Sequence, residues 1–408
     1  MALSRWAVAA AALALVVGVI ASACGGRRAV PQAPFWPRRV AVSAPARVLF
    51  RSPLAPGVPG THRYEYVFPD RAIVIYDIDH RHQLVERVSI PEAHGFRGIA
   101  VSPKTGMLYM SVGGNGGTSG TGSLIAYNLR RDRIVWERAF PTGTDSPAIT
   151  PDGRTIFLPT GERTTDDIWY VVNARTGEVM HEIDAGPGPH NTIVSPNGQR
   201  VYLGPRNSRY LYVASTRTDR IIRKIGPLRS GVRPFTIDGR HELAYTTATG
   251  FLGFQVSSIR TGQVLYTVPI RGVRGRHSQG APSHGISLSP DSHSLYVIDI
   301  PNSHVHVYDV SDVPARPPRH IADIPLTRPM TGREHPCGGD CGRAGWLQHS
   351  LDGRYVYVGD SGDVINTKTH RVVAFLPALH NSRYLFELDW HGTTPRRTST
   401  RSGIGYER

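Results

Sequence analysis

Residues 289–309 read SPDSHSLYVIDIPNSHVHVYD, and the pattern within them decides the fold. A tight turn comes first, because Pro290 presets φ at the turn's first central position and Asp291 tolerates the geometry that follows. An alternating strand around Tyr296 comes next, and then a short apolar strand that closes on Asp309. Seven apolar strands of this last kind end on a small acid, amide or hydroxyl residue: Ile73–Asp77, Leu124–Asn128, Trp169–Asn173, Tyr210–Ser215, Phe254–Ser257, Val305–Asp309 and Asp363–Asn366.

The final residues of these segments are 51, 45, 42, 42, 52 and 57 positions apart. One supersecondary unit therefore recurs about every fifty residues, which is typical of a propeller or a solenoid. A strand of small apolar residues precedes each turn, and another strand follows each apolar segment, so a unit contains four antiparallel strands, as one propeller blade does. The turns are Ser102–Gly106, Thr150–Gly153, Ser195–Gly198, Thr236–Gly239, Ser289–Ser292 and Ser350–Gly353.

There are six turns but seven apolar segments, so one unit lacks its inner strand. We expect Tyr384–Leu388 to supply it, beside Tyr64–Phe68, Ala72–Asp77 and Leu84–Ile90. Closing a ring in this way removes the edges that an open array would expose. The predicted fold is all-β: a seven-bladed β-propeller of four-stranded antiparallel blades over residues 62–392, with a C-terminal tail over 393–408.

The chain resembles the YVTN-type (YncE-like) seven-bladed β-propeller proteins. The resemblance rests on an aromatic pattern just after the turns: Leu108-Tyr-Met110, Val201-Tyr-Leu203, Leu295-Tyr-Val297 and Val356-Tyr-Val358. Thr-Asn never follows the Tyr-Val pair here, which departs from the repeat that names the group. The resemblance implies the fold and leaves the function open, because the group includes scaffolds, binding proteins and enzymes.

The N-terminus is predicted to be a targeting segment. Arg5 provides a positive start, and residues 6–23 are almost wholly apolar, which predicts a signal peptide over 1–23. Ala21-Ser-Ala-Cys24 resembles a lipobox, in which Cys24 would be acylated; ordinary cleavage and an uncleaved anchor are the alternatives. Residues 24–61 are rich in Pro, Gly and Arg and predict a tether. We expect an extracytoplasmic protein, periplasmic or at the cell surface, lipid-anchored and monomeric.

The formal charge is +15, with 47 basic and 32 acidic residues. Only Lys104, Lys224 and Lys368 are lysines, and the 44 arginines are spread along the chain rather than gathered in a run. This distribution argues against nucleic-acid binding and favours attraction to an anionic envelope surface or polymer.

In a propeller the inner strands line a central channel, so the residues that begin them form a ring at one mouth. Counting back from each turn predicts binding at this mouth by residues remote in sequence, and the alternative is a water-filled polar channel without a ligand. The candidate residues are His94, Arg97, Asp145, His190, Arg233, His284, Trp346 and His380.

Histidine is the commonest metal ligand, and the chain has 18 histidines. Convergence of His190, His284 and His380 would suit Zn or Cu, but no closely spaced pair lies at the mouth, so we expect no metal or other cofactor. The pair His304-x-His306 is interpreted as an exposed strand face. Cys337 and Cys341 predict a small-loop disulfide, with metal binding alongside His335 as the alternative.

These observations favour a binding or scaffold protein whose partner is an unknown envelope protein or small ligand. The first alternative is an enzyme of the lactonase or lyase propeller type, with His190 or His284 as the general base and Arg97 or Arg233 stabilising an oxyanion. The second is a metal- or redox-associated propeller.

Overall fold

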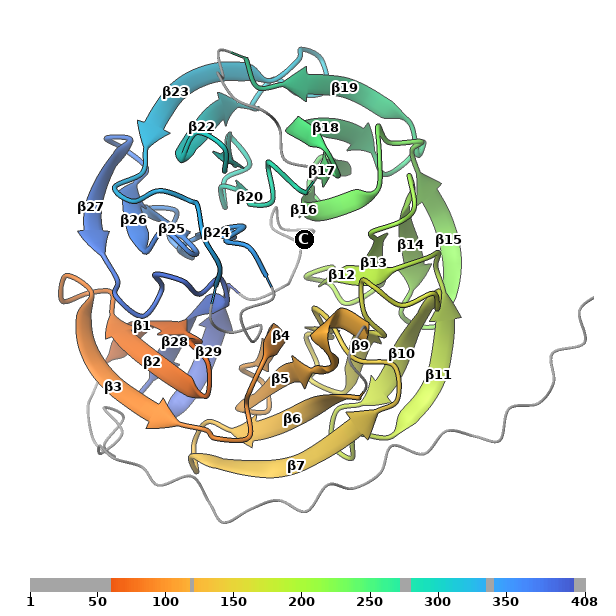
Figure 1. The fold of residues 1–408 in the computed structure, drawn as a ribbon, viewed down its shortest axis with the longest axis vertical. Coiled ribbons are helices and arrows are strands. Elements are labelled where there is room, and N and C mark those ends of the chain that lie inside the picture. The colour runs from red at the N-terminus through yellow and green to blue at the C-terminus, as the bar shows by residue number, and fades with distance from the viewer. Residues whose placement is uncertain (1–59, 118–120, 272–279, 335–340, 400–408) are drawn as a thin grey trace, which may run out of the picture. The chain divides into compact units, whose positions relative to one another are not determined.

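The computed structural model describes residues 60–117, 121–271, 280–334 and 341–399. Seven antiparallel sheets are arranged in a ring around a central axis (Figure 1). The prediction of an all-β, seven-bladed propeller is confirmed. The short 3₁₀ segment η1 (Gly114–Gly117) joins β5 to β6. No helix in the described ranges is long and apolar enough to cross a membrane.

Six blades each use four consecutive strands, running from the channel to the rim (Figure 1). In chain order they are β4 (Phe96–Ser102), β5 (Met107–Gly113), β6 (Gly122–Asn128) and β7 (Arg133–Phe140); β8 (Ala148–Ile149), β9 (Thr155–Pro159), β10 (Ile168–Asn173) and β11 (Val179–Asp184); β12 (Pro189–Val194), β13 (Arg200–Pro205), β14 (Leu211–Ser215) and β15 (Arg220–Ile225); β16 (Val232–Asp238), β17 (Leu243–Ala248), β18 (Phe251–Ser258) and β19 (Val264–Pro269); β20 (Ile286–Leu288), β21 (Ser294–Asp299), β22 (His304–Asp309) and β23 (Arg319–Pro325); and β24 (Leu347–His349), β25 (Tyr355–Val358), β26 (Asp363–Asn366) and β27 (Arg371–Phe375).

The seventh blade joins the two ends of the ring. Strand β28 (Leu385–His391) pairs antiparallel with β1 (Thr61–Val67), and β2 (Ala72–Asp77) and β3 (Gln83–Ser89) follow outward. The structure adds a fifth strand that the sequence did not predict: β29 (Thr394–Thr398) pairs with β28 on its channel side. Part of the predicted tail is therefore an additional innermost strand.

The polar residue that ends each third strand has a structural role. The side chain of Asp77 accepts hydrogen bonds from the backbone N–H groups of Asp79 and His80, at 2.9 and 3.1 Å. Asn128 does the same for Arg130 and Arg131. A short side-chain acceptor is needed because it satisfies turn amides that no strand can reach. In the fifth unit this residue is Ser258 rather than the expected Ser257.

The core lies between blades and is built from the alternating strands that follow the turns. Their central aromatic residues are all buried, each in an apolar cluster that includes residues of a neighbouring sheet: Tyr109, Phe157, Tyr202, Tyr245, Tyr296 and Tyr357.

A β-bulge recurs between the third and fourth strands of every blade, so one residue of each outer strand has no partner. In six blades this extra residue is an exposed apolar side chain: Val135, Met180, Ile222, Leu265, Ile321 and Val373.

Candidate functional site

The inner strands begin around one end of the channel, which we call the arginine mouth. A cavity of about 250 Å³ lies there. Six of the eight predicted residues line it: Arg97, Asp145, His190, Arg233, His284 and Trp346. His190 and His284 are 94 positions apart in the sequence, yet their ring centroids are 6.3 Å apart.

The other two predicted residues do not line this cavity. His94 is half-exposed, and its Nδ1 lies 2.8 Å from Asp70 Oδ2. The Nδ1 of His380 lies 3.1 Å from the backbone oxygen of Asp360. His190, His284 and His380 therefore do not form the three-histidine cluster that a Zn or Cu site would need.

Glu162, which follows β9, is the centre of the charge network in the arginine mouth. Its carboxylate accepts from Arg97 Nη2 at 3.0 Å and lies 2.8 Å from Arg206 Nη1 and 3.3 Å from Arg233 Nη1. Burial opposes ionisation, but the surrounding positive charges outweigh it and hold the pKa of Glu162 well below its usual range. Glu162 therefore stays ionised and holds three guanidinium groups together.

Asp145 forms a second link between blades. It is fully buried, and its Oδ2 accepts from Arg97 Nη2 at 3.1 Å, while its Oδ1 lies 3.1 Å from His190 Nδ1. Burial alone would raise the pKa of Asp145, but His190 and Arg97 lower it. His190 thus has a carboxylate near each ring nitrogen, because its Nε2 lies 3.9 Å from Glu162.

The opposite wall of the cavity comes from Arg383 and Tyr384, which precede β28, and from the long segment between β23 and β24, which we call the insertion. Arg383 pairs with the buried Glu334 through two contacts of 2.6 Å. The ring of Trp346 packs edge-on against Tyr384 and stacks on His284, with centroids 5.4 and 6.4 Å apart. The bidentate pairing of Arg383 with Glu334 fixes the orientation of the guanidinium plane.

His284 differs from His190 in its surroundings. It is buried, and its Nδ1 has no hydrogen-bond partner among the described residues. Burial, followed by the charges of Arg383 and Arg233, lowers its pKa well below the usual range. The imidazole is therefore neutral at pH 7.

The cavity lining is strongly basic. Six arginines contribute to it against two carboxylates, or three when Glu334 behind Arg383 is counted: Arg97, Arg163, Arg206, Arg233, Arg343 and Arg383. Burial lowers the pKa of Arg233 to about 10, so this guanidinium is still charged at pH 7. A concave site with one dominant sign of charge concentrates the field within it.

Sequence reasoning missed Glu162, Arg206 and Arg383. The first two follow the second strands of their blades, whereas the repeat predicts only residues at or just before the start of the first strands. Arg383 lies two positions before β28, as His284 lies two positions before β20. Aligning Tyr384–Leu388 with the other inner strands would have selected Arg383 instead of His380.

The predicted disulfide stays a prediction, because Cys337 lies outside the described residues. Cys341 lines the arginine mouth, and its Sγ lies 3.3 Å from Arg97 Nη1. The insertion therefore does reach the channel mouth. Cys24, the predicted lipidation site, also lies outside the described residues.

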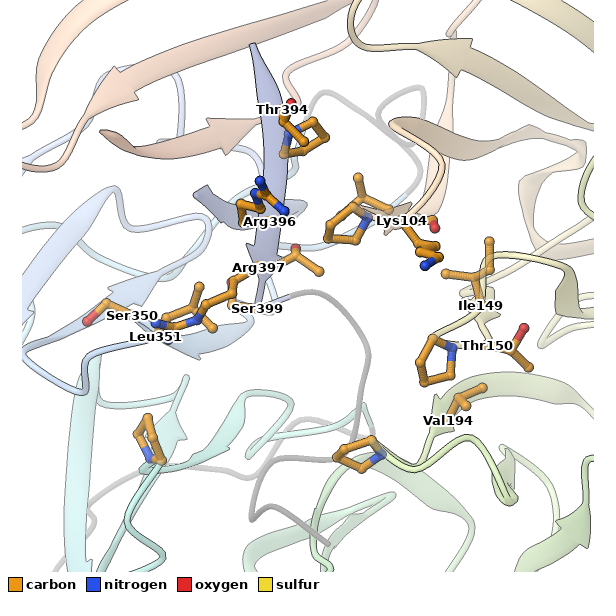
Figure 2. Close-up of a pocket in the computed structure, with 18 of the residues that line it drawn as sticks. Lys104, Ile149, Thr150, Val194, Ser350, Leu351, Thr394, Arg396, Arg397 and Ser399 are labelled. Carbon is orange, nitrogen blue, oxygen red and sulfur yellow. The ribbon is translucent and has the colours of Figure 1, made fainter. Parts of the chain in front are cut away.

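The other end of the channel, where the inner strands end, holds a larger cavity of about 600 Å³ (Figure 2). We call it the proline mouth, since four turn prolines line it: Pro103, Pro151, Pro196 and Pro290. Lys104 lies on one side, and Arg396 and Arg397 of β29 lie on another (Figure 2).

Strand β29 lines the proline mouth over its whole length. It starts at the proline mouth with Thr394 and runs back along β28, so that Thr398 lies opposite Leu388. Ser399 then donates its N–H to the backbone oxygen of Glu387 at 3.1 Å and accepts from the Gln348 side chain. A small cavity of about 70 Å³ is lined by Ser399 together with His284 and Trp346, which also line the arginine mouth.

No family model matches this chain, and no curated protein matches it. Many solved structures share this fold, among them the following two. A functionally unknown protein from Desulfotomaculum acetoxidans has 11% identity and a TM-score of 0.60, covering 79% of this chain and 98% of its own. Hydrazine synthase from Kuenenia stuttgartiensis has 15% identity and a TM-score of 0.52, covering 76% of this chain and 96% of its own. At these identities the similarity establishes the propeller fold alone.

Proposed function

We propose that this protein binds a small anion, of the carboxylate or phosphate class, at the arginine mouth. The observation that carries the proposal is the excess of six arginines over two carboxylates around one cavity. Guanidinium groups match planar carboxylates and phosphates through paired N–H donors. A volume of about 250 Å³ is slightly below the range of typical ligand sites, which favours a metabolite-sized ligand over a polymer.

The proposed setting is extracytoplasmic, with the propeller tethered to a membrane through Cys24. It is supported by the apolar segment over 6–23, the lipobox-like Ala21–Cys24 and the Pro-rich stretch that follows. The proposed kinship with YVTN-type propellers is supported by the Tyr pattern after the turns. Membrane fractionation of the wild type and Cys24→Ala tests the anchor: release of the variant into the soluble fraction is expected, and equal retention contradicts lipidation.

A thermal-shift titration with citrate and with inorganic phosphate tests ligand binding, with chloride at matched ionic strength as the reference. A ligand that binds only the folded state raises Tm in proportion to ln(1 + [L]/Kd). We expect a rise with at least one anion, lost in Arg206→Gln, which removes a partly exposed guanidinium from the lining. Arg260→Ala, an exposed site in another blade, is the control. Equal responses in all three proteins contradict the proposal.

A second candidate function is catalysis at the same mouth. The specific observation is His284, a buried neutral imidazole beside a basic cavity, which has the protonation state of a general base. The arginines would stabilise an oxyanion. Hydrolysis of a lactone panel by the wild type, absent in His284→Ala, would support this candidate; ligand-induced stabilisation without turnover would favour binding alone.

A further inference from the structure

The rim of the blade formed by β20–β23 holds a cluster separate from both mouths. His306 lies on β22, and His320 and Asp323 lie on the outer strand β23. One ligand atom from each of the three residues lies within 4.8 Å of the other two. The prediction that His304 and His306 lie on an exposed strand face is wrong, because His306 is buried, and the Nδ1 of His304 lies 2.7 Å from the backbone oxygen of Asn302.

The bulge of this blade explains how the cluster forms. His306 faces Asp323 across the strand pair, and Tyr308 faces His320, so Ile321 is the extra residue. Residues three apart on a regular strand point to opposite faces. The bulge removes that alternation and places His320 and Asp323 on the same face as His306.

The three side chains converge on one carboxylate oxygen. Asp323 Oδ1 lies 2.5 Å from His306 Nδ1 and 2.6 Å from His320 Nε2. The His306 side chain is only 9% exposed, whereas those of His320 and Asp323 are 45% and 53% exposed. One ligand is therefore fixed, and two can adjust toward solvent.

A buried carboxylate orients the fixed ligand. His306 Nε2 lies 3.2 Å from Asp299 Oδ2, and Asp299 is fully buried and held by the Asn302 amide at 2.7 and 2.8 Å. A proton on Nε2 shared with Asp299 leaves the Nδ1 lone pair directed at the cluster. Such a second carboxylate behind a ligating histidine is typical of metal sites.

We propose that this cluster is a binding site for a divalent transition-metal ion such as Zn²⁺, with His306 Nδ1, His320 Nε2 and Asp323 Oδ1 as ligands and water in the remaining position. Two imidazoles and a carboxylate form a donor set that suits Zn²⁺. Ligand atoms about 2.0–2.1 Å from a tetrahedral ion lie roughly 3.3 Å apart, so the two exposed side chains must move outward by about 1 Å.

Zn²⁺ titration by isothermal calorimetry of the full chain, purified without a histidine tag, tests the site. We expect one ion per chain at this cluster, and loss of that ion in His320→Ala and in Asp323→Asn. Both side chains are half-exposed, so circular dichroism should show an unchanged fold. Asp299→Asn should weaken affinity about 10–100-fold, because it removes the orienting carboxylate.

Two control variants separate this site from other histidines. His241→Ala removes an exposed histidine whose Nδ1 lies 2.8 Å from Asp238, a pair without a second imidazole, and should leave Zn²⁺ binding unchanged. His284→Ala tests the arginine mouth. The inference is overturned if no ion binds stoichiometrically, if His320→Ala and Asp323→Asn bind Zn²⁺ like the wild type, or if His284→Ala alone abolishes binding.

Discussion

Replacing Glu162 by Gln tests whether one carboxylate holds the arginine mouth together. The change keeps the shape of the side chain and removes the charge that contacts Arg97, Arg206 and Arg233. Removing one partner of a buried ion pair typically costs about 3–5 kcal/mol, because the remaining charge stays buried and uncompensated.

The structure places the expected loss near the lower end of that range. Arg97 keeps its contact with Asp145 at 3.1 Å, and Arg233 keeps its hydrogen bond to Thr249 at 2.9 Å. A loss of about 3 kcal/mol corresponds to a fall in Tm of about 4 °C for a ring of roughly 340 residues, since the unfolding entropy is about 2.1 cal/mol/K per residue.

Differential scanning calorimetry at pH 7 and low salt measures this change. Glu178→Gln is the matched control, because it makes the same substitution at an exposed position of the same blade. Citrate should raise the Tm of Glu162→Gln by more than it raises the Tm of the wild type, because the added anion replaces the missing negative charge. A Tm for Glu162→Gln equal to or above that of Glu178→Gln refutes the reasoning.

Three further predictions concern the closure of the ring and the insertion. A chain ending at Gly392 lacks β29 but keeps β28, so we expect it to elute as a folded monomer in size-exclusion chromatography, with a larger cavity at the proline mouth. Aggregation would show that β29 is needed to close the ring. Burial raises the pKa of Glu387 to about 8 and also raises that of Glu65, which it faces. Their contribution to stability is therefore present below about pH 4.3 and lost as the pH rises through about 8, and urea unfolding should show that Glu387→Gln flattens this dependence. Mass spectrometry of unreduced peptides should find Cys337 joined to Cys341, and two alkylated thiols would contradict the disulfide.

The fold was predictable because its signals are local and repeated. A side-chain acceptor such as Asp77 must end each third strand, and a buried aromatic such as Tyr202 must follow each turn, so both recur at a readable period. Ring closure followed from counting, since a seventh apolar segment required an inner strand from elsewhere. Strand β29 left no such signal, because Thr394–Thr398 contains Pro and Arg rather than an alternating apolar pattern.

The arginine mouth was only partly predictable. The inner-strand positions of Arg97 and His190 follow from the repeat, but Glu162, at the centre of the charge network, lies in the loop between β9 and β10, outside the inner strands. The rim cluster depended on a bulge at Ile321, and a one-residue register shift is not visible in the sequence.

The seven bulges also bear on how copies of the chain meet one another. Each blade ends in an outer strand whose outward N–H and C=O groups pair with no other strand of the described ranges, and an unprotected edge of this kind is a template for adding a strand from another molecule. A bulge bends the strand and breaks its regular spacing, so an incoming strand cannot pair along the whole edge. The apolar side chains displayed there, such as Ile222 and Val373, sit one to a blade instead of merging into a patch. The periphery is thus built against polymerisation seven times over, by the same one-residue insertion.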